Sequence, residues 1–546
     1  MTHHSLITRF LSLMMLLFLI AFSPHSYAQA LMINWQQCYG GSEGETGISM
    51  IPASNGYMLF CGTSSGDGQV PGNHGLTDFW LVRTDIAGNI LWSKVYGGSG
   101  DEYPMQMAKY FDDGYILCGS TFSNNYKSNP NGDVIGNHGS PDYWVLRVDT
   151  AGNIVWAKCF GGTDYELAAG VTITSDSGIV ISGKSASTDG NVTGNHGGYD
   201  MWIMKLFPDG NINWEKSFGG SLSDGADHIA ATPDGGMIVA GYTSSPDGDV
   251  QCNYHGGNYD AWILKLDLEG NIEWQRCYGG TDSDNAVMIL PAADNGYLFC
   301  ASTSSDDGDV SGNHGGIDYW VVKIDHQGEI QWQKCYGGSK NDNATCIKAG
   351  SDNSFYIGGY TSSDDGDVSG NHSWSGLRDM WLIKISGEGA LMWQQCFGGS
   401  MDEILNDIAV MPDNQLMLFG YSETPDNTGD VHCEHHGPGN TDAWLLSLTD
   451  TTSVGIPPVN NLHNTVSSCP NPATNQITFK FDIAPDGKDL RLIIYNEFGK
   501  VQHIFPLPAA RGEFQWNTEN ISPGVYYYNF CNDRFSKTGK IVILKE

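Results

Sequence analysis

The sequence predicts an all-β protein, a seven-bladed β-propeller followed by a small immunoglobulin-like β-sandwich. Three observations predict this architecture. Two tryptophan motifs each occur seven times at intervals of about 60 residues, the two motifs keep a fixed distance from each other, and neither occurs after residue 450. Internal repetition of this kind is the sequence signature of propellers and related repeat folds.

The repeat unit is built from short β-like segments. Repeat five offers segments 330–336, 344–348, 354–361 and 379–385, separated by turn clusters such as 364–367. Four short strands per unit fit a propeller blade, whereas helical repeats would show a 3.6-residue period. The W-x-x-x-[YF]-G-G motif starts at Trp35, Trp92, Trp156, Trp214, Trp274, Trp332 and Trp393, and the D-x-W motif ends at Trp80, Trp144, Trp202, Trp262, Trp320, Trp381 and Trp444.

The spacing of the two motifs predicts how the repeat array closes. From each D-x-W tryptophan to the following W-x-x-x-[YF] tryptophan the distance is 12 residues, which predicts a tight hairpin of fixed register. Six such hairpins leave the strand of Trp35 unpaired at the start and the strand of Trp444 unpaired at the end. We expect these two strands to pair and to close residues 29–450 into a ring without an exposed sheet edge.

The N-terminus has the pattern of an export signal over residues 1–28. Arg9 supplies a positive charge, residues 10–22 are almost entirely apolar, and Ser26 and Ala28 precede an expected cleavage before Gln29. A buried core helix is the alternative interpretation. The apolar run is too short to cross a bilayer, and no later stretch reaches 18 apolar residues, so we predict no transmembrane segment.

The charge balance restricts the classes of partner. A formal net charge of -35 would repel nucleic acid and anionic membrane surfaces. It fits an extracellular protein or one that collects cations.

The 13 cysteines suggest disulfides at first, but most of them occupy repeated positions. Because equivalent residues of neighbouring repeats usually lie too far apart to bridge, we expect most to be buried thiols. Cys252 and Cys433 instead replace a loop glycine in repeats four and seven, and we expect no disulfide between them. The repeated positions hold Cys38, Cys159, Cys277, Cys335 and Cys396 in one set and Cys61, Cys118 and Cys300 in another.

The composition changes after residue 450. Residues 451–468 lack the repeat and contain Pro457 and Pro458, which predicts a linker, and residues 469–546 show new β patterning that predicts a second domain. Its motifs are Cys469-Pro-Asn-Pro-Ala-Thr474, Ile493-Ile-Tyr-Asn-Glu-Phe-Gly-Lys500, Ile521-Ser-Pro-Gly-Val-Tyr-Tyr-Tyr528 and Lys540-Ile-Val-Ile-Leu-Lys545.

These four motifs, in this order, resemble the type A sorting domain of type IX secretion substrates in Bacteroidota. Cys469 departs from the aromatic residue usual in that family. The resemblance implies that residues 469–546 engage the type IX secretion machinery, and that the protein is secreted or held at the cell surface after the domain is removed. The alternative is an ordinary accessory β-sandwich. The repeats also resemble those of secreted propeller proteins with the same tail, which implies no activity.

The polar loop before each D-x-W strand is the main candidate for chemistry. A histidine precedes the aspartate by four residues in most copies, which predicts a structural clamp like the His–Asp pair of WD40 blades. The loop of repeat five also offers oxygen ligands suited to calcium, or simply a solvated turn. The clamp pairs are His74 with Asp78, His138 with Asp142, His196 with Asp200, and His314 with Asp318; the looser copy is His372 with Asp379. The calcium ligands are Asp306, Asp307, Asp309, Asn313 and Asp318.

Two departures from the repeat suggest further sites. Repeat seven carries His432, Cys433, His435 and His436, which could hold a transition metal although their spacing matches no known zinc motif. Repeat six inserts Trp374 near Arg378, which could form a sugar-stacking platform or pack against its own blade.

The sequence leaves three functions open. We expect first a non-catalytic propeller that binds a polysaccharide or a protein partner, with calcium as the only cofactor considered. An extracellular carbohydrate-active enzyme is the second hypothesis, because acidic residues are abundant, although no catalytic pair can be selected among them. A structural surface-layer protein is the third. No nucleophile-elbow, zincin, P-loop or dinucleotide fingerprint is present.

Overall fold

The computed structural model describes residues 31–546 except 112, 124–131, 253–254, 256–257, 374–375, 412–414, 425–427, 435–439, 451–464, 470–473, 483–489, 497–499, 508–510, 520, 532–535 and 546. The predicted signal peptide and its cleavage site therefore lie outside the described residues. The chain divides into two compact units, residues 1–453 and 454–546. Within the described residues there is no helix with the length and apolar character needed to cross a bilayer.

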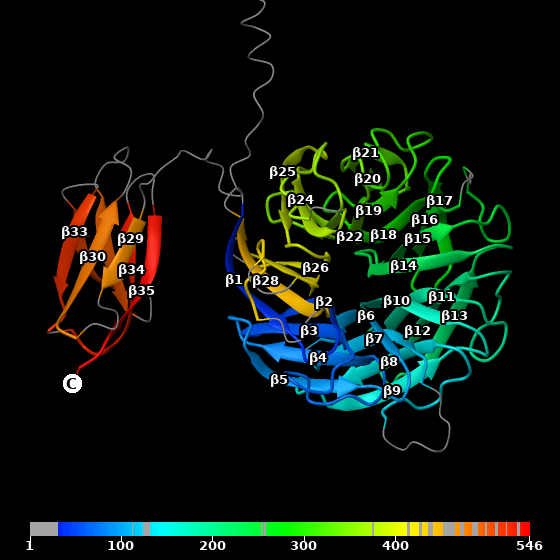
Figure 1. Cartoon of the computed structure of the whole chain (residues 1–546), viewed down its shortest axis with the longest axis horizontal. Helices are drawn as coiled ribbons and strands as arrows, with labels where there is room; N and C mark the ends of the chain where they lie inside the picture. Colours follow the sequence, from blue (N-terminus) through cyan, green and yellow to red (C-terminus); the bar gives the residue numbers. More distant parts are fainter. Residues whose placement is uncertain are drawn as a thin grey trace, which may run out of the picture. The chain divides into compact units, whose positions relative to one another are not determined.

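The first unit consists of repeated four-stranded antiparallel sheets, and Figure 1 shows them arranged around a common centre. Consecutive strands form each sheet. They are β2 (Glu45–Ala53), β3 (Gly56–Thr63), β4 (Asp78–Thr84) and β5 (Ile90–Tyr96); β6 (Glu102–Lys109), β7 (Tyr115–Thr121), β8 (Asp142–Val148) and β9 (Ile154–Phe160); β10 (Glu166–Ile173), β11 (Ile179–Ser185), β12 (Asp200–Leu206) and β13 (Ile212–Phe218); β14 (Asp224–Ala231), β15 (Met237–Thr243), β16 (Asp260–Leu266) and β17 (Ile272–Tyr278); β18 (Asp284–Pro291), β19 (Tyr297–Thr303), β20 (Asp318–Ile324) and β21 (Ile330–Tyr336); β22 (Asp342–Ala349), β23 (Phe355–Thr361), β24 (Asp379–Ile385) and β25 (Leu391–Phe397).

One further sheet joins the two ends of the repeat array. It has the order β1-β28-β27-β26 and combines β1 (Leu31–Tyr39) with β26 (Glu403–Val410), β27 (Gln415–Ser422) and β28 (Asp442–Asp450). Strand β1 pairs with β28 in antiparallel register, so that Cys38 lies opposite Trp444. The pairing that the sequence predicts for the two terminal strands is therefore present. In this sheet β1 takes the outer position that β5, β9 and the corresponding last strands hold in the other sheets.

The tryptophans of the D-x-W motif form the core between neighbouring sheets. All of them are fully buried, and each strand that carries one also buries most of its other side chains. Aromatic residues link one sheet to the next: the rings of Phe79 and Trp144 lie 4.7 Å apart, as do those of Tyr143 and Trp202. Such aromatic pairs add to the free energy gained from burial alone.

The tryptophans of the W-x-x-x-[YF]-G-G motif pack against a hairpin turn of the following repeat, and this turn requires glycine. At Gly210 the backbone φ is 77°, and a Cβ atom there would lie 2.9 Å from the indole of Trp156. A side chain at this position would be strained and would clash, which explains the glycine of the turn.

The second unit contains two sheets that share one apolar core. The sheet β29-β30-β33 comprises β29 (Thr465–Cys469), β30 (Gln476–Asp482) and β33 (Arg511–Asn517), and the sheet β32-β31-β34-β35 comprises β32 (Val501–Pro506), β31 (Arg491–Asn496), β34 (Gly524–Cys531) and β35 (Ser536–Ile543). Phe479, Leu492 and Phe530 belong to the shared core. The predicted linker 451–468 is too long at its C-terminal end, because β29 starts at Thr465 and pairs with β30.

Candidate functional site

The inner strands of the sheets surround a central cavity of about 320 Å³. Each inner strand has one irregularity in its pairing with the next strand; in β14 the register runs from Ala226 to His228 and skips Asp227. A bulge of this kind turns a side chain out of the regular alternation and is frequent beside functional sites. The skipped residues all line the cavity: Ile48, Met105, Ala169, Asp227, Val287, Thr345 and Asn406.

The lining differs from one repeat to the next although the backbone does not. The first three repeats present Ile48, Met105 and Ala169 at the bulge, and the later ones present Asp227, Val287, Thr345 and Asn406. A residue that repeats in every blade serves packing, whereas specific recognition needs asymmetry. The cavity is therefore the place where this symmetric scaffold carries individual chemistry.

One carboxylate of the cavity is fully engaged by neighbouring groups. Asp407 on β26 accepts hydrogen bonds from the backbone N–H groups of Met50 and Ile408, at 2.8 and 2.9 Å. Its Oδ1 also lies 3.1 Å from the ammonium of Lys348 on β22. The charge of Asp407 raises the pKa of Lys348 against the opposing effect of burial. This ion pair fixes both side chains on one side of the cavity.

A second set of polar side chains in the cavity comes from β14 and β18, and some of their atoms have no hydrogen-bond partner among the described residues. Burial raises the pKa of the Asp227 carboxyl to about 6, and the neighbouring Asn285 side chain acts in the opposite direction. The imidazole of His228 is buried, and burial together with the charge of Lys348 lowers its pKa to about 3. Asp227 Oδ2, His228 Nδ1 and Asn285 Oδ1 have no hydrogen-bond partner among the described residues.

An aromatic cluster with one lysine lies near Asp227. Lys184 donates a hydrogen bond of 3.1 Å to the hydroxyl of Tyr242 and lies 5.2 Å from the ring centre of Tyr199. The rings of Tyr242 and Tyr259 are 4.8 Å apart, and Tyr259 is 40% exposed. Burial raises the pKa of Tyr242, and the charge of Asp227 adds to the effect, so the cluster is within electrostatic range of the cavity.

The structure brings together each predicted histidine–aspartate pair at the start of its D-x-W strand. In each pair the aspartate also accepts a hydrogen bond from the backbone N–H of the histidine, and the aspartate is fully buried. The distances from Nδ1 to Oδ2 are 3.0 Å for His74 and Asp78, 2.6 Å for His138 and Asp142, 2.7 Å for His196 and Asp200, 2.6 Å for His314 and Asp318, and 2.7 Å for His372 and Asp379.

Three of these histidines, His196, His314 and His372, also reach an acid of the next sheet. His196 Nε2 lies 3.7 Å from Asp249, and His372 Nε2 lies 3.7 Å from Asp430, each in the loop of the following repeat. The pKa of His196 and of His372 is raised, in each case first by the hydrogen bond to its own aspartate. The histidine therefore connects two blades as well as closing its own loop.

Sequence reasoning missed two members of these junctions. His255 pairs with Asp260 at 3.1 Å, but a gap of five residues hides it from a four-residue search. A second buried acid stands at the start of each inner strand, close to the clamp aspartate. In repeat five both acids lie beside Gly337: a Cβ atom on this glycine would be 2.4 Å from Asp318 Oδ1 and 2.8 Å from Asp342 Oδ2. The repeated pattern [YF]-G-G-x-x-x-[DE] is the signal that could have revealed it.

The five proposed calcium ligands make separate contacts instead of converging. Asp307 Oδ1 accepts a hydrogen bond from Thr281 N, Asp306 Oδ1 from Gly312 N, and Asn313 Oδ1 from Gly315 N. Asp309 lies 3.9 Å from His255 of the preceding repeat, and Asp318 is engaged by His314. Across the described ranges, no three His, Cys, Asp or Glu side chains are grouped so that they could hold a metal ion.

Two disulfides correct the prediction for the cysteines. Cys252 bonds to Cys277 and Cys38 bonds to Cys433, each joining a loop to the outer strand of the same sheet. Cys38 and Cys277 are therefore not free thiols, because each faces a loop cysteine at a Cα distance of 5.4 Å that a disulfide can bridge. As expected, Cys252 and Cys433 do not bond to each other. The described free cysteines are buried: Cys61, Cys118, Cys159, Cys300, Cys335, Cys346 and Cys396.

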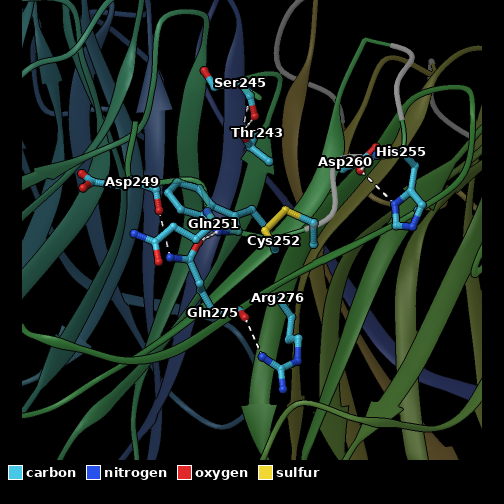
Figure 2. Close-up of a disulfide and its surroundings, with 12 residues drawn as sticks. Thr243, Ser245, Asp249, Gln251, Cys252, His255, Asp260, Gln275 and Arg276 are labelled. Atoms are coloured by element: carbon cyan, nitrogen blue, oxygen red, sulfur yellow. Dashed lines mark hydrogen bonds and ion pairs between the residues drawn. A yellow bond between two sulfur atoms is a disulfide. The ribbon is translucent and has the colours of Figure 1, made fainter. Parts of the chain in front are cut away.

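Figure 2 shows the Cys252 disulfide in its surroundings. Gln275, beside Cys277, donates a 2.8 Å hydrogen bond to the carbonyl of Asp249 and accepts one from Gln251 N at 3.2 Å. The loop is thus held to the outer strand β17 by the disulfide and these hydrogen bonds, and to the start of β16 by the His255–Asp260 pair.

The predicted transition-metal cluster loses its thiolate. Cys433 is bonded to Cys38 and cannot act as a ligand, while His432 is described and His435 and His436 lie outside the described residues. Trp374 of the predicted stacking platform also lies outside them. Arg378 forms a two-point contact with Asp402 of the next sheet and lies 5.2 Å from the ring centre of Tyr360. Its guanidinium is thus engaged in joining two sheets.

Comparison with known proteins identifies the second unit. A family model described as a secretion system C-terminal sorting domain matches residues 469–544. Regulatory protein FlaEY of Caulobacter vibrioides is 24% identical over 239 residues, which cover 40% of this chain and only 25% of that protein.

Similar solved structures include the Pan2 WD40 domain of Neurospora crassa and a polysaccharide lyase of family PL25, an ulvan lyase. The WD40 domain has 10% identity and a TM-score of 0.40, with 77% of this chain and 97% of that chain covered. The lyase has 9% identity and a TM-score of 0.43, with 77% and 100% covered. At these values neither neighbour indicates an activity.

The chain thus combines a repeated all-β scaffold with a secretion sorting domain at residues 469–544, which points to export through the type IX secretion system to the cell surface or the medium.

Proposed function

We propose that this protein is a secreted or surface-held seven-bladed β-propeller that binds a polysaccharide or protein partner without catalysis. Residues 469–546, as an immunoglobulin-like domain, engage the type IX secretion machinery of a Bacteroidota cell, and residues 1–28 direct the first export step. The observation that carries the proposal is the asymmetric cavity on the otherwise symmetric ring. The exposed Tyr259 beside Tyr242 supports a sugar ligand, because aromatic rings stack on sugar faces.

The state of the carboxylates in the cavity favours binding over hydrolysis. Cleavage of a glycosidic bond generally uses two carboxyl groups on opposite sides of the bond. Asp407 is occupied by Lys348 and two backbone donors, which leaves Asp227 as the only other carboxylate in the described lining.

One observation favours the enzyme hypothesis as second candidate. The pKa of Asp227 is raised to about 6, in the range where a carboxyl can act as a general acid near neutral pH. If this hypothesis holds, Asp227 is the residue whose replacement abolishes activity.

A single assay separates these functions. The purified secreted protein is incubated with a panel of soluble and insoluble polysaccharides, with and without a calcium chelator. We expect retention without release of new reducing ends. Release of reducing ends would replace the binding proposal by the enzyme hypothesis, and loss of retention with chelator would support calcium in the loops of Asp306–Asp318. Self-association in the absence of retention would favour the surface-layer role.

A further inference from the structure

A second hollow adjoins the central cavity, between the sheet β18–β21 and the sheet β22–β25. Its volume is about 340 Å³, within the range of small-molecule sites. The described lining carries no charged side chain and places hydroxyl and amide groups next to apolar ones. The lining residues that matter most are Ser283, Ser302, Ser304, Ile317, Asn343 and Tyr360.

These side chains meet at the start of two neighbouring inner strands. Asn343 on β22 lies opposite Tyr360 on β23, and its amide nitrogen is 3.5 Å from the hydroxyl of Ser302 on β19 of the preceding sheet. The backbone N–H of Ser304 donates to the carbonyl of Ser283 at 2.9 Å. All five residues are half-buried, so each keeps some surface that a ligand in the hollow can reach.

An equivalent junction of an earlier repeat explains why this space is open. Between the sheets β10–β13 and β14–β17, the position of Ser302 is held by Lys184, since each faces the second residue of its inner strand. Lys184 reaches across the junction and donates to the hydroxyl of Tyr242, the counterpart of Tyr360, at 3.1 Å. The serine side chain is too short to span the junction, and the space in front of Tyr360 stays unfilled.

The chemistry of the hollow fits an uncharged sugar. Sugar hydroxyls both donate and accept hydrogen bonds, as do the three serine hydroxyls and the amide of Asn343. The ring of Tyr360 provides a flat apolar surface for the C–H face of a sugar. Sugars with carboxylate or sulfate groups would find no cation in the described lining and would be repelled by a chain with a net charge of -35.

We propose that the hollow beside Tyr360 binds one uncharged sugar residue, with Ser302 and Asn343 as hydrogen-bonding partners and Tyr360 as the stacking surface. Val287 and Thr345 line both this hollow and the central cavity, so a glycan bound here can continue into the cavity. The inference rests on the proposed binding function and narrows its ligand to neutral glycans.

Titration calorimetry of the full secreted chain tests the ligand class. The neutral probes are cellotetraose, maltotetraose, laminaritetraose and mannotetraose, and the acidic probe is tetragalacturonate. We expect at least one neutral probe to bind with one-to-one stoichiometry and roughly tenfold or more tightly than the acidic probe. Its affinity should be the same in low and in high salt, because no ion pair forms. Equal or tighter binding of tetragalacturonate, or no binding of any neutral probe, would overturn the proposal.

Variants connect the binding to the hollow. Tyr360→Ala should weaken binding of the neutral probe roughly tenfold or more, and Ser302→Lys, which introduces the side chain that fills the equivalent junction, should weaken it at least as much. Tyr165→Ala is the matched control, since it removes a tyrosine that is 45% exposed and outside the lining, and it should bind as the parent does. Melting curves check that each variant is folded. Should Tyr360→Ala fail to fold, Ser302→Lys carries the same test, and parental affinity in the folded variants would refute the proposal.

Retention on polysaccharides or on a protein partner is scored separately from these titrations. Retention that persists unchanged in Tyr360→Ala and Ser302→Lys would put the binding surface elsewhere and overturn this inference while the proposed function stands. Binding of a neutral tetrasaccharide without retention on any polymer or partner would support the site and contradict the proposed function.

Discussion

Replacing both Cys38 and Cys433 by serine is expected to lower the free energy of unfolding by about 6 kcal/mol, and the same change at Cys252 and Cys277 by about 3.5 kcal/mol. The two disulfides occupy the same position in their sheets and have the same Cα distance of 5.4 Å. They differ in the length of chain that they enclose, because their sequence separations are 395 and 25 residues. A crosslink removes more entropy from the unfolded chain when its loop is longer.

The first of these bonds also secures the closure of the ring. Cys38 lies on β1, which pairs with β28 across the ends of the repeat array, and Cys433 lies in the loop that precedes β28. Urea-unfolding midpoints of the two double-serine variants provide the measurement, with the Cys252 and Cys277 variant as the matched control. Equal losses in the two variants would mean that loop entropy does not govern the seam.

The variant Asp318→Asn is expected to stabilise the protein at pH 8 by roughly 1–3 kcal/mol, with a smaller gain at pH 5. Burial is the main reason why the pKa of Asp318 is raised from 3.8 to about 6. Because this folded-state pKa is raised, the stability that the protonated carboxyl contributes is fully present below about pH 4 and is lost as the pH rises through about 6.

The geometry explains why asparagine should be tolerated. Its Oδ1 can keep the contacts of Asp318 Oδ2 with His314, while Nδ2 can donate toward Asp342, where the aspartate has a buried oxygen without a partner in the described structure. Melting temperatures at pH 5 and pH 8 provide the test. Asp325→Asn is the control, since the pKa of this half-buried carboxyl is lowered, first by the backbone hydrogen bond from Glu329, and its replacement should give no gain. A loss of stability at pH 8 would show that ionised Asp318 is needed at the junction.

Much of the scaffold could be predicted from sequence because its signals are local and repeated. The position of Trp80 relative to Trp92 defines a hairpin, and its recurrence defines the sheets and their register. The closing pair β1–β28 was also predictable, because a ring leaves those two strands as the ones without partners. The spacing of His314 and Asp318 likewise predicted a contact that is made within one loop.

The central cavity, the disulfides and the acid pairs required the tertiary structure. Asp227 and Asp407 are 180 positions apart in the sequence and look like any other acid of an acidic chain until the arrangement of the sheets brings β14 and β26 to one central cavity, which both side chains line. Cys38 and Cys433 meet only because the ring closes. The sequence by itself determined the repeat, its strands and the export tail, since hydrogen bonding and side-chain alternation act between near neighbours. The three-dimensional arrangement decided which distant side chains share one low-dielectric environment, and the candidate chemistry of this protein depends on that environment.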